Sequence, residues 1–144
     1  IRSRTDLREW CQSGPPGLAI CNYEKFNPDK KAAPGTGEVI NECRHLAGVV
    51  LDEAGRLRAS GGKQKWALVK SHKGIEYKLT LTATPAPNDL MEFASQAAYL
   101  EKMRTENDII WTFFTRDQRT QKWTVKPHAR SAFFEWMATW SVYV

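Results

Sequence analysis

The chain has 144 residues, of which 42% are apolar and 26% are charged, so it is long enough to bury a core as one domain or part of one. Its 21 lysine and arginine residues exceed 16 acidic residues, and the formal charge of +5 permits a polyanionic partner without requiring one. No apolar run approaches the ~18 residues of a membrane helix, and three cysteines without a C-x-x-C pair argue against a disulfide framework or a zinc site. The chain starts at Ile1 without an initiator methionine or a targeting signature. We therefore expect a piece of a longer protein from a reducing, cytoplasmic compartment, with no membrane partner.

Three short apolar runs predict strands in the first two-thirds of the chain. Leu18–Asn22 follows a turn rich in glycine and proline and predicts the first strand. The run from residue 47 to 51 is continuously apolar and ends in Asp52 and Glu53, as expected of a parallel strand that is buried on both faces. The third run, Tyr77–Thr82, is rich in β-forming residues.

Two helices are expected between these strands. They cover Glu38–His45 and Lys63–His72, and Gly74 follows the second at a C-cap position. Alternating strands and helices predict an α/β fold, with a parallel sheet covered by helices on both faces. Cys43 is expected in or near the core.

Beyond residue 87 the apolar spacing becomes helical. Asn88 is a candidate N-cap for a helix whose apolar positions are Leu90, Phe93, Ala94, Ala97 and Leu100. Thr105 and Asp108 have capping-box spacing before a second short helix. We expect residues 1–88 to contain the sheet and residues 89–144 to form a helical segment.

A third helix is predicted from Pro127 onward. Its apolar stripe contains Ala129, Ala132, Phe133, Trp136, Met137 and Trp140. The six tryptophans of the chain suggest base stacking, but membership of this stripe favours core packing for Trp136 and Trp140.

The adjacent carboxylates after the second strand are the strongest candidate site. Asp52 could hold a hydrated Mg²⁺, and Glu53 could orient or deprotonate an attacking water, as nucleotide hydrolases require. The alternative is an acidic pair that only solubilises the end of a strand. The hydroxyl-rich segment after the third strand could sense a group bound beside this pair, or it could be an ordinary turn.

The charge of the chain is concentrated in one stretch. Between Arg56 and Lys78 there are seven cations and one anion, a local charge of +6. Such a stretch could neutralise phosphates of a nucleic acid, although a run of cations is also typical of a solvated helix face.

The order and spacing of these segments resemble the Swi/Snf group of superfamily-two helicase-like ATPases, particularly the shorter versions in phages and bacteria. Ile20–Phe26 resembles motif Ib, Val49–Arg58 resembles motif II (the Walker B strand), and Leu79–Asn88 resembles motif III. Phe113–Trp140 resembles the helical insertion between the two motor lobes. The resemblance implies an incomplete RecA-like P-loop NTPase lobe followed by this insertion.

The same resemblance implies roles for individual residues in an intact parent protein. Asp52 would bind Mg²⁺ through water, and Glu53 would activate water for ATP hydrolysis. The residues that couple hydrolysis to lobe closure would be Thr82, Ala83, Thr84 and Pro85. The nucleic-acid contacts would come from Asn22, Tyr23, Lys25, Arg56, Arg58, Lys63 and Lys65. ATP and Mg²⁺ would be the cofactors, and double-stranded DNA, bound without sequence preference, would be the partner.

Two departures from the family pattern matter. Gly55 occupies the position of the motif II histidine, which normally links hydrolysis to motif III. The phosphate-binding loop, Gly-x-x-x-x-Gly-Lys followed by Ser or Thr, does not occur in the sequence, and the motifs of the second lobe are missing as well. We therefore expect the upstream strands, the ATP-binding loop and the second lobe in the parent, and no tight ATP binding by this chain. The alternative is a non-catalytic module, derived from such a lobe, that binds nucleic acid or protein.

Overall fold

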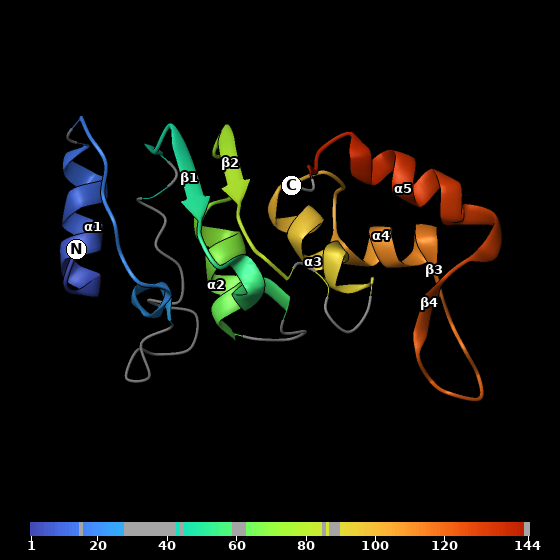
Figure 1. The fold of residues 1–144 in the computed structure, drawn as a ribbon. Helices are drawn as coiled ribbons and strands as arrows, with labels where there is room; N and C mark the ends of the chain where they lie inside the picture. Colours follow the sequence, from blue (N-terminus) through green and yellow to red (C-terminus); the bar gives the residue numbers. More distant parts are fainter. Residues whose placement is uncertain are drawn as a thin grey trace. The chain divides into compact units, whose positions relative to one another are not determined.

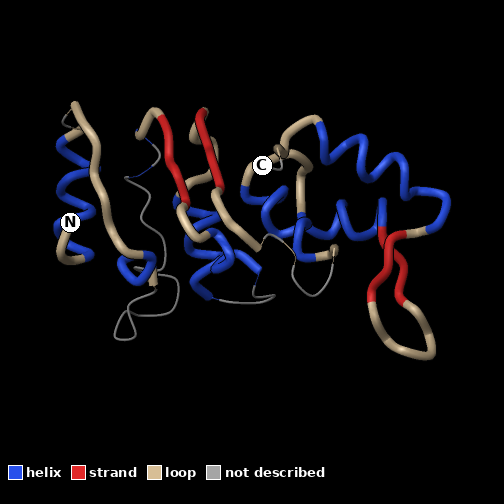
Figure 2. Tube along the Cα trace, in the orientation of Figure 1, coloured by secondary structure: helices blue, strands red, loops and turns tan. Residues whose placement is uncertain are grey.

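The computed structural model describes residues 1–14, 16–27, 43, 45–58, 63–84, 86 and 90–142. The chain divides into two compact units, Ile1–Leu81 and Thr82–Val144, whose elements are drawn in Figures 1 and 2. The sequence places the division a few residues later, after residue 88. No helix in the described ranges combines the length and apolar character needed to cross a bilayer.

A two-stranded parallel sheet organises the first unit. β1 (Gly48–Leu51) pairs with β2 (Tyr77–Thr80) in a register that runs from Gly48↔Tyr77 to Leu51↔Thr80. α2 (Lys63–Ser71) lies between them in the chain, which confirms the two predicted strands and the predicted helix. The fold is thus mixed α/β with a small parallel sheet (Figure 2).

One face of this sheet is exposed, contrary to the expectation that helices cover both faces. Val50 and Leu79 are register partners, so their side chains share a face, and they are 59% and 50% exposed. Leu51, on the opposite face, is only 5% exposed. The described part of the chain contains no element that covers the Val50 side, so β1 is buried on one face.

The predicted strand Leu18–Asn22 does not form. These residues have no strand pairing, and Leu18 and Ile20 are 89% and 78% exposed. A strand exists only when a neighbour completes its hydrogen-bond ladder, and no described residue does so here. The strand that the local sequence pattern predicted here is therefore wrong.

A helix that the sequence analysis did not predict begins the chain. α1 (Arg4–Ser13) starts in a capping box, in which Ser3 Oγ accepts from the Asp6 backbone N–H at 3.0 Å and Asp6 Oδ2 accepts from the Ser3 N–H at 3.0 Å. The Ser3 hydroxyl also donates to Asp6 Oδ1, and this bond, followed by the one from the Ser3 backbone N–H, lowers the pKa of Asp6. The helix ends at Gly14, whose φ of 56° is the left-handed conformation that glycine adopts readily.

The remaining predictions for the first unit have mixed outcomes. The predicted helix Glu38–His45 lies outside the described residues except at Cys43 and His45. Cys43 is fully buried, as predicted. Leu57 and Leu68 are also fully buried. The short helices η1 (Tyr23–Phe26) and η3 (Ala54–Arg58) both contact α2.

The second unit contains three helices that the sequence predicts. α3 (Glu92–Tyr99) begins at Glu92, so the start implied by an Asn88 cap is wrong, and Asn88 itself lies outside the described residues. α4 (Glu106–Phe113) is capped as predicted, because Thr105 Oγ1 accepts from the Asp108 N–H at 3.1 Å. A short turn at Pro127 leads into α5 (Arg130–Ala138), also as predicted.

A β-hairpin interrupts what the sequence predicts to be a wholly helical segment. β3 (Phe114–Arg116) pairs antiparallel with β4 (Trp123–Val125). Their β-branched and aromatic residues favour strands. The turn is held by Asp117 Oδ1, which accepts from the N–H groups of Arg119 and Thr120 at 2.7 and 2.8 Å. These bonds, the one from Thr120 first, lower the pKa of Asp117.

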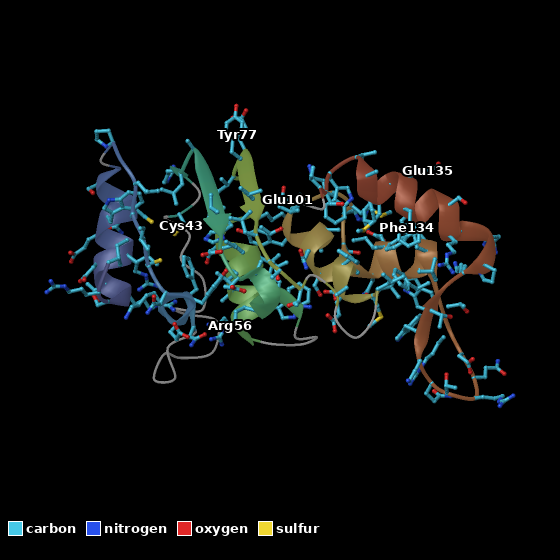
Figure 3. All side chains as sticks on the ribbon, in the orientation of Figure 1. Cys43, Arg56, Tyr77, Glu101, Phe134 and Glu135 are labelled. Carbon is cyan, nitrogen blue, oxygen red and sulfur yellow. The ribbon has the colours of Figure 1, made fainter. Side chains whose placement is uncertain are left out.

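An aromatic cluster forms the core of the second unit. Phe133 is fully buried, with its ring centroid 5.4 Å from that of Phe113 and 5.3 Å from that of Phe114. Trp136 and Trp140 are partly buried and pack against this cluster, which confirms the core interpretation of both. Phe134, which follows Phe133 on α5 and is labelled in Figure 3, is exposed.

Candidate functional site: the carboxylates after β1

The Asp52 and Glu53 turn is fixed to the end of β2. Leu81 donates its N–H to the Leu51 carbonyl at 2.8 Å, and Ala54 donates to the Leu81 carbonyl at 2.8 Å. The turn is therefore clamped on both sides, and the two carboxylates follow the carboxyl end of a parallel strand. In open α/β sheets this edge is where ligands bind.

Both carboxylates are open to solvent. Asp52 and Glu53 are exposed, Asp52 Oδ1 accepts the Glu53 N–H at 3.0 Å, and within the described ranges neither residue forms an ion pair. Glu53 has a φ of 52°, a left-handed conformation that disfavours a non-glycine residue by roughly 1–2 kcal/mol. The tight turn thus imposes an unusual backbone on the residue that is predicted to act on water.

The possible metal ligands of the turn are its two carboxylates. No described group of three or more His, Cys, Asp and Glu side chains could hold a metal by itself. Mg²⁺ typically uses one or two protein carboxylates and completes its shell with water and phosphate oxygens. The exposed carboxylate of Asp52 fits that requirement.

The structure brings together the segments that resemble motifs Ib and II, which the sequence does not reveal. The Tyr23 hydroxyl, from η1, donates to the Asp52 carbonyl oxygen. Burial, and then the nearby charge of Asp52, raise the pKa of Tyr23. Glu24 and Arg56 add an ion pair at 3.8 Å between the same segments, so η1 supports the carboxylate turn.

The predicted nucleic-acid contacts of the first unit are unequally placed. Asn22 is exposed, and Lys25 is partly buried. Arg56 is exposed (Figure 3), and both side chains of its ion pair with Glu24 are open to solvent. The ion pair therefore holds the Arg56 side chain only weakly. Lys65 is 2% exposed, with Nζ 5.0 Å from the ring centroid of Trp66, and does not present its ammonium group to a ligand. The side chains of Arg58 and Lys63 are not among those that the structure describes.

The predicted coupling residues belong to the second unit. Thr82 is partly buried, Ala83 and Thr84 are exposed, and Thr82 Oγ1 accepts the Thr84 N–H at 3.2 Å. Pro85 lies outside the described residues. The hydroxyl-rich segment therefore begins directly after Leu81, the residue that clamps the carboxylate turn.

A cavity of about 500 Å³ lies in the first unit between α1, residues 17–23 and β1. Its walls are mostly apolar, with polar atoms from Tyr23, Asp52 and His72. Burial, with a smaller contribution from Lys78, lowers the pKa of His72 to about 4. The mostly apolar lining makes the cavity itself unsuited to phosphate, and Asp52 is the residue that it shares with the carboxylate turn.

No protein-family model matches the chain, and no solved structure gives a significant match. The chain is similar to protein p41 of Acyrthosiphon pisum secondary endosymbiont phage 1, with 31% identity over 97 residues that cover 60% of this chain and 21% of that protein. The chain thus spans about a fifth of the length of this curated relative, whose name states no activity.

Proposed function

We propose that this chain is the later part of the first RecA-like lobe of a nucleic-acid-dependent ATPase, of the Swi/Snf type that its motifs resemble. The observation that carries the proposal is the clamped turn after β1, where exposed Asp52 and Glu53 follow the carboxyl end of a parallel strand. The hydroxyl-rich segment begins immediately after the neighbouring strand. This is the order of parts that a Walker B strand and motif III require.

The backbone of Glu53 supports a functional role. Non-glycine residues in left-handed conformations are disfavoured and gather at functional sites. Glu53 keeps such a conformation while its carboxylate remains exposed and without an ion pair in the described chain.

In the proposed enzyme Asp52 would hold Mg²⁺ through water, and the ion would neutralise phosphate oxygens of ATP. Glu53 would orient the attacking water and accept its proton. Tyr23 would hold the Asp52 backbone in place through its hydroxyl. The phosphate-binding loop and the second lobe would be contributed by other parts of the parent protein.

The test uses the longer protein that carries this segment. Glu53→Gln should lower kcat by ~100-fold or more with ATP binding nearly intact, because the lost group acts on the chemical step. Asp52→Asn should instead weaken Mg²⁺-dependent nucleotide binding. Glu76→Gln is the matched control, since Glu76 is an exposed carboxylate between α2 and β2. Single-turnover hydrolysis and binding of a labelled ATP analogue separate these effects.

Hydrolysis by Glu53→Gln at the rate of the Glu76→Gln control would refute the Walker B assignment and favour the non-catalytic interaction module. The isolated chain should release no phosphate from ATP above background, with or without duplex DNA, because the loop that positions the β- and γ-phosphates is missing from its sequence. Turnover by the isolated chain that Glu53→Gln abolished would contradict the assignment of a missing loop.

A further inference from the structure

We propose that the β3–β4 hairpin of the second unit binds the phosphate backbone of duplex DNA. The surface consists of Arg116, Arg119, Lys122 and Arg130 together with Trp111, and we call it the basic hairpin surface. The proposal deepens the proposed function by naming a DNA contact outside motif Ib and the basic stretch of the first unit.

The positive charges of the second unit are concentrated in the segment that forms the hairpin and the start of α5. Residues 114–130 contain five cations and one anion, whereas residues 90–113 and 131–142 together contain two cations and five anions. The positive end of the unit is therefore complementary to a polyanion.

The cations of the basic hairpin surface are not neutralised within the described chain. The one acidic residue among them, Asp117, directs a carboxylate oxygen to the backbone N–H groups of Arg119 and Thr120. Arg116 Nε donates to the Gln121 carbonyl at 3.3 Å. Among the described residues of the unit, the ion pair is Arg104 with Asp108, at 3.9 Å, so the four cations of the surface remain available.

An exposed tryptophan lies at the base of the hairpin. Trp111, in the last turn of α4, is 71% exposed, and its ring lies edge-on to that of Trp123 with centroids 6.4 Å apart. Lys126 Nζ donates to the Trp111 carbonyl at 2.6 Å and to the Thr112 carbonyl at 3.3 Å. The base of the hairpin is thus tied to the end of α4, and Trp111 is held beside it.

The shape of the hairpin suits a groove. Its turn extends away from the helices of the second unit (Figures 1 and 2), and a two-stranded ribbon fits the major groove of B-form DNA. Contacts to phosphates from arginine and lysine carry no sequence information. A protein partner would be expected to meet an apolar patch depleted in charge, and this surface is mainly charged.

The test measures binding of the full chain to a fluorescein-labelled duplex by anisotropy across a salt series, without nucleotide. The double variant Arg119→Gln/Lys122→Gln should lower affinity ~10-fold or more and reduce the slope of log K against log salt by about 2. The matched control Lys102→Gln/Arg104→Gln removes the same charge from the α3–α4 connection and should change affinity less than ~3-fold. Equal losses in both variants would overturn the proposal.

Two further measurements keep the result decisive. Arg130→Gln should reduce the slope of log K against log salt by about 1. Because Arg130 is on α5 and not in the hairpin, this variant tests the surface even if the hairpin variant folds poorly. Displacement of the duplex by polyglutamate at equal charge concentration would identify the surface as a docking site for an acidic protein and overturn the proposal. Because Asp52 and Glu53 are unchanged and ATP is absent, failure here is distinguishable from failure of the ATPase assignment.

Discussion

Buried His72 should make the first unit unstable in mild acid. The residue is 1% exposed, and its ring meets the edge of Phe26 with centroids 5.0 Å apart. Burial, helped by Lys78, lowers its pKa from 6.5 to about 4. The unfolded chain therefore takes up the proton first, so the contribution to stability is complete above pH 6.5 and is lost as the pH falls toward 4.

The size of the effect follows from these two pKa values. The full loss is about 3 kcal/mol once the pH is below both, and about 2 kcal/mol is already lost at pH 5. This is a large part of the 5–15 kcal/mol that typically separates folded from unfolded domains. Protection of α2 amides from hydrogen exchange in urea, measured between pH 7 and 5, reports on this unit separately from the other.

The matched variants are His72→Leu and His45→Leu, because His45 is an exposed histidine of the same unit. Between pH 7 and 5, the free energy of unfolding should fall by about 2 kcal/mol less in His72→Leu than in the wild type, whatever the stability of the variant at pH 7. His45→Leu should follow the wild type. An equal loss in His72→Leu and wild type would show that other groups cause the acid sensitivity and would refute the reasoning.

Three other predictions concern packing and thiol chemistry. Phe133→Ala should lower the free energy of unfolding of the second unit by about 3–5 kcal/mol, since it empties the centre of the aromatic cluster; exposed Phe134→Ala is the control, and similar urea midpoints for the two variants would contradict this. Gly48→Ala should cost about 1–3 kcal/mol, because a Cβ there would lie 3.1 Å from the Tyr77 Cβ and 3.2 Å from its carbonyl oxygen; an unchanged urea midpoint would count against it. Cys11 and Cys43 have Sγ atoms 3.2 Å apart, so hydrogen peroxide should oxidise the two thiols to an intrachain disulfide with release of water. Mass spectrometry should detect this disulfide in Cys21→Ser but not in Cys11→Ser. A disulfide that contains Cys21 instead would show that the pairing is wrong.

The local sequence pattern predicted an element correctly where the folded structure pairs the strand that the pattern marks or caps the helix at the residue that it marks. The apolar run before Asp52 and the β-forming run from Tyr77 predicted the paired strands, and the Thr105 cap predicted the start of α4. α1 was missed although its two buried residues, Leu7 and Cys11, are spaced four apart, as on one face of a helix. The pair Ser3 and Asp6, at capping-box spacing, was the signal available in the sequence.

Other features depend on contacts that a local pattern does not contain. The run at Leu18–Asn22 has the composition of a strand but no described neighbour to pair with. The strands of the hairpin are three residues each, too short to show an alternating pattern. The sequence predicted the two carboxylates of the candidate site. It did not predict the hydrogen bond from Tyr23 to Asp52, because this bond joins residues that are 29 positions apart.

The exposed face of the parallel sheet should give the two sides of each strand opposite mutational tolerance. In a saturation screen of the isolated chain, Val50, Leu79 and Leu81, which are 59%, 50% and 45% exposed, should accept polar residues. Leu51, next to Val50 but 5% exposed, should not, because each polar replacement there removes buried apolar area. The same screen in a longer protein would show Val50, Leu79 and Leu81 becoming intolerant if another segment covered them. Tolerance at these three positions is thus a genetic readout of what packs against the sheet.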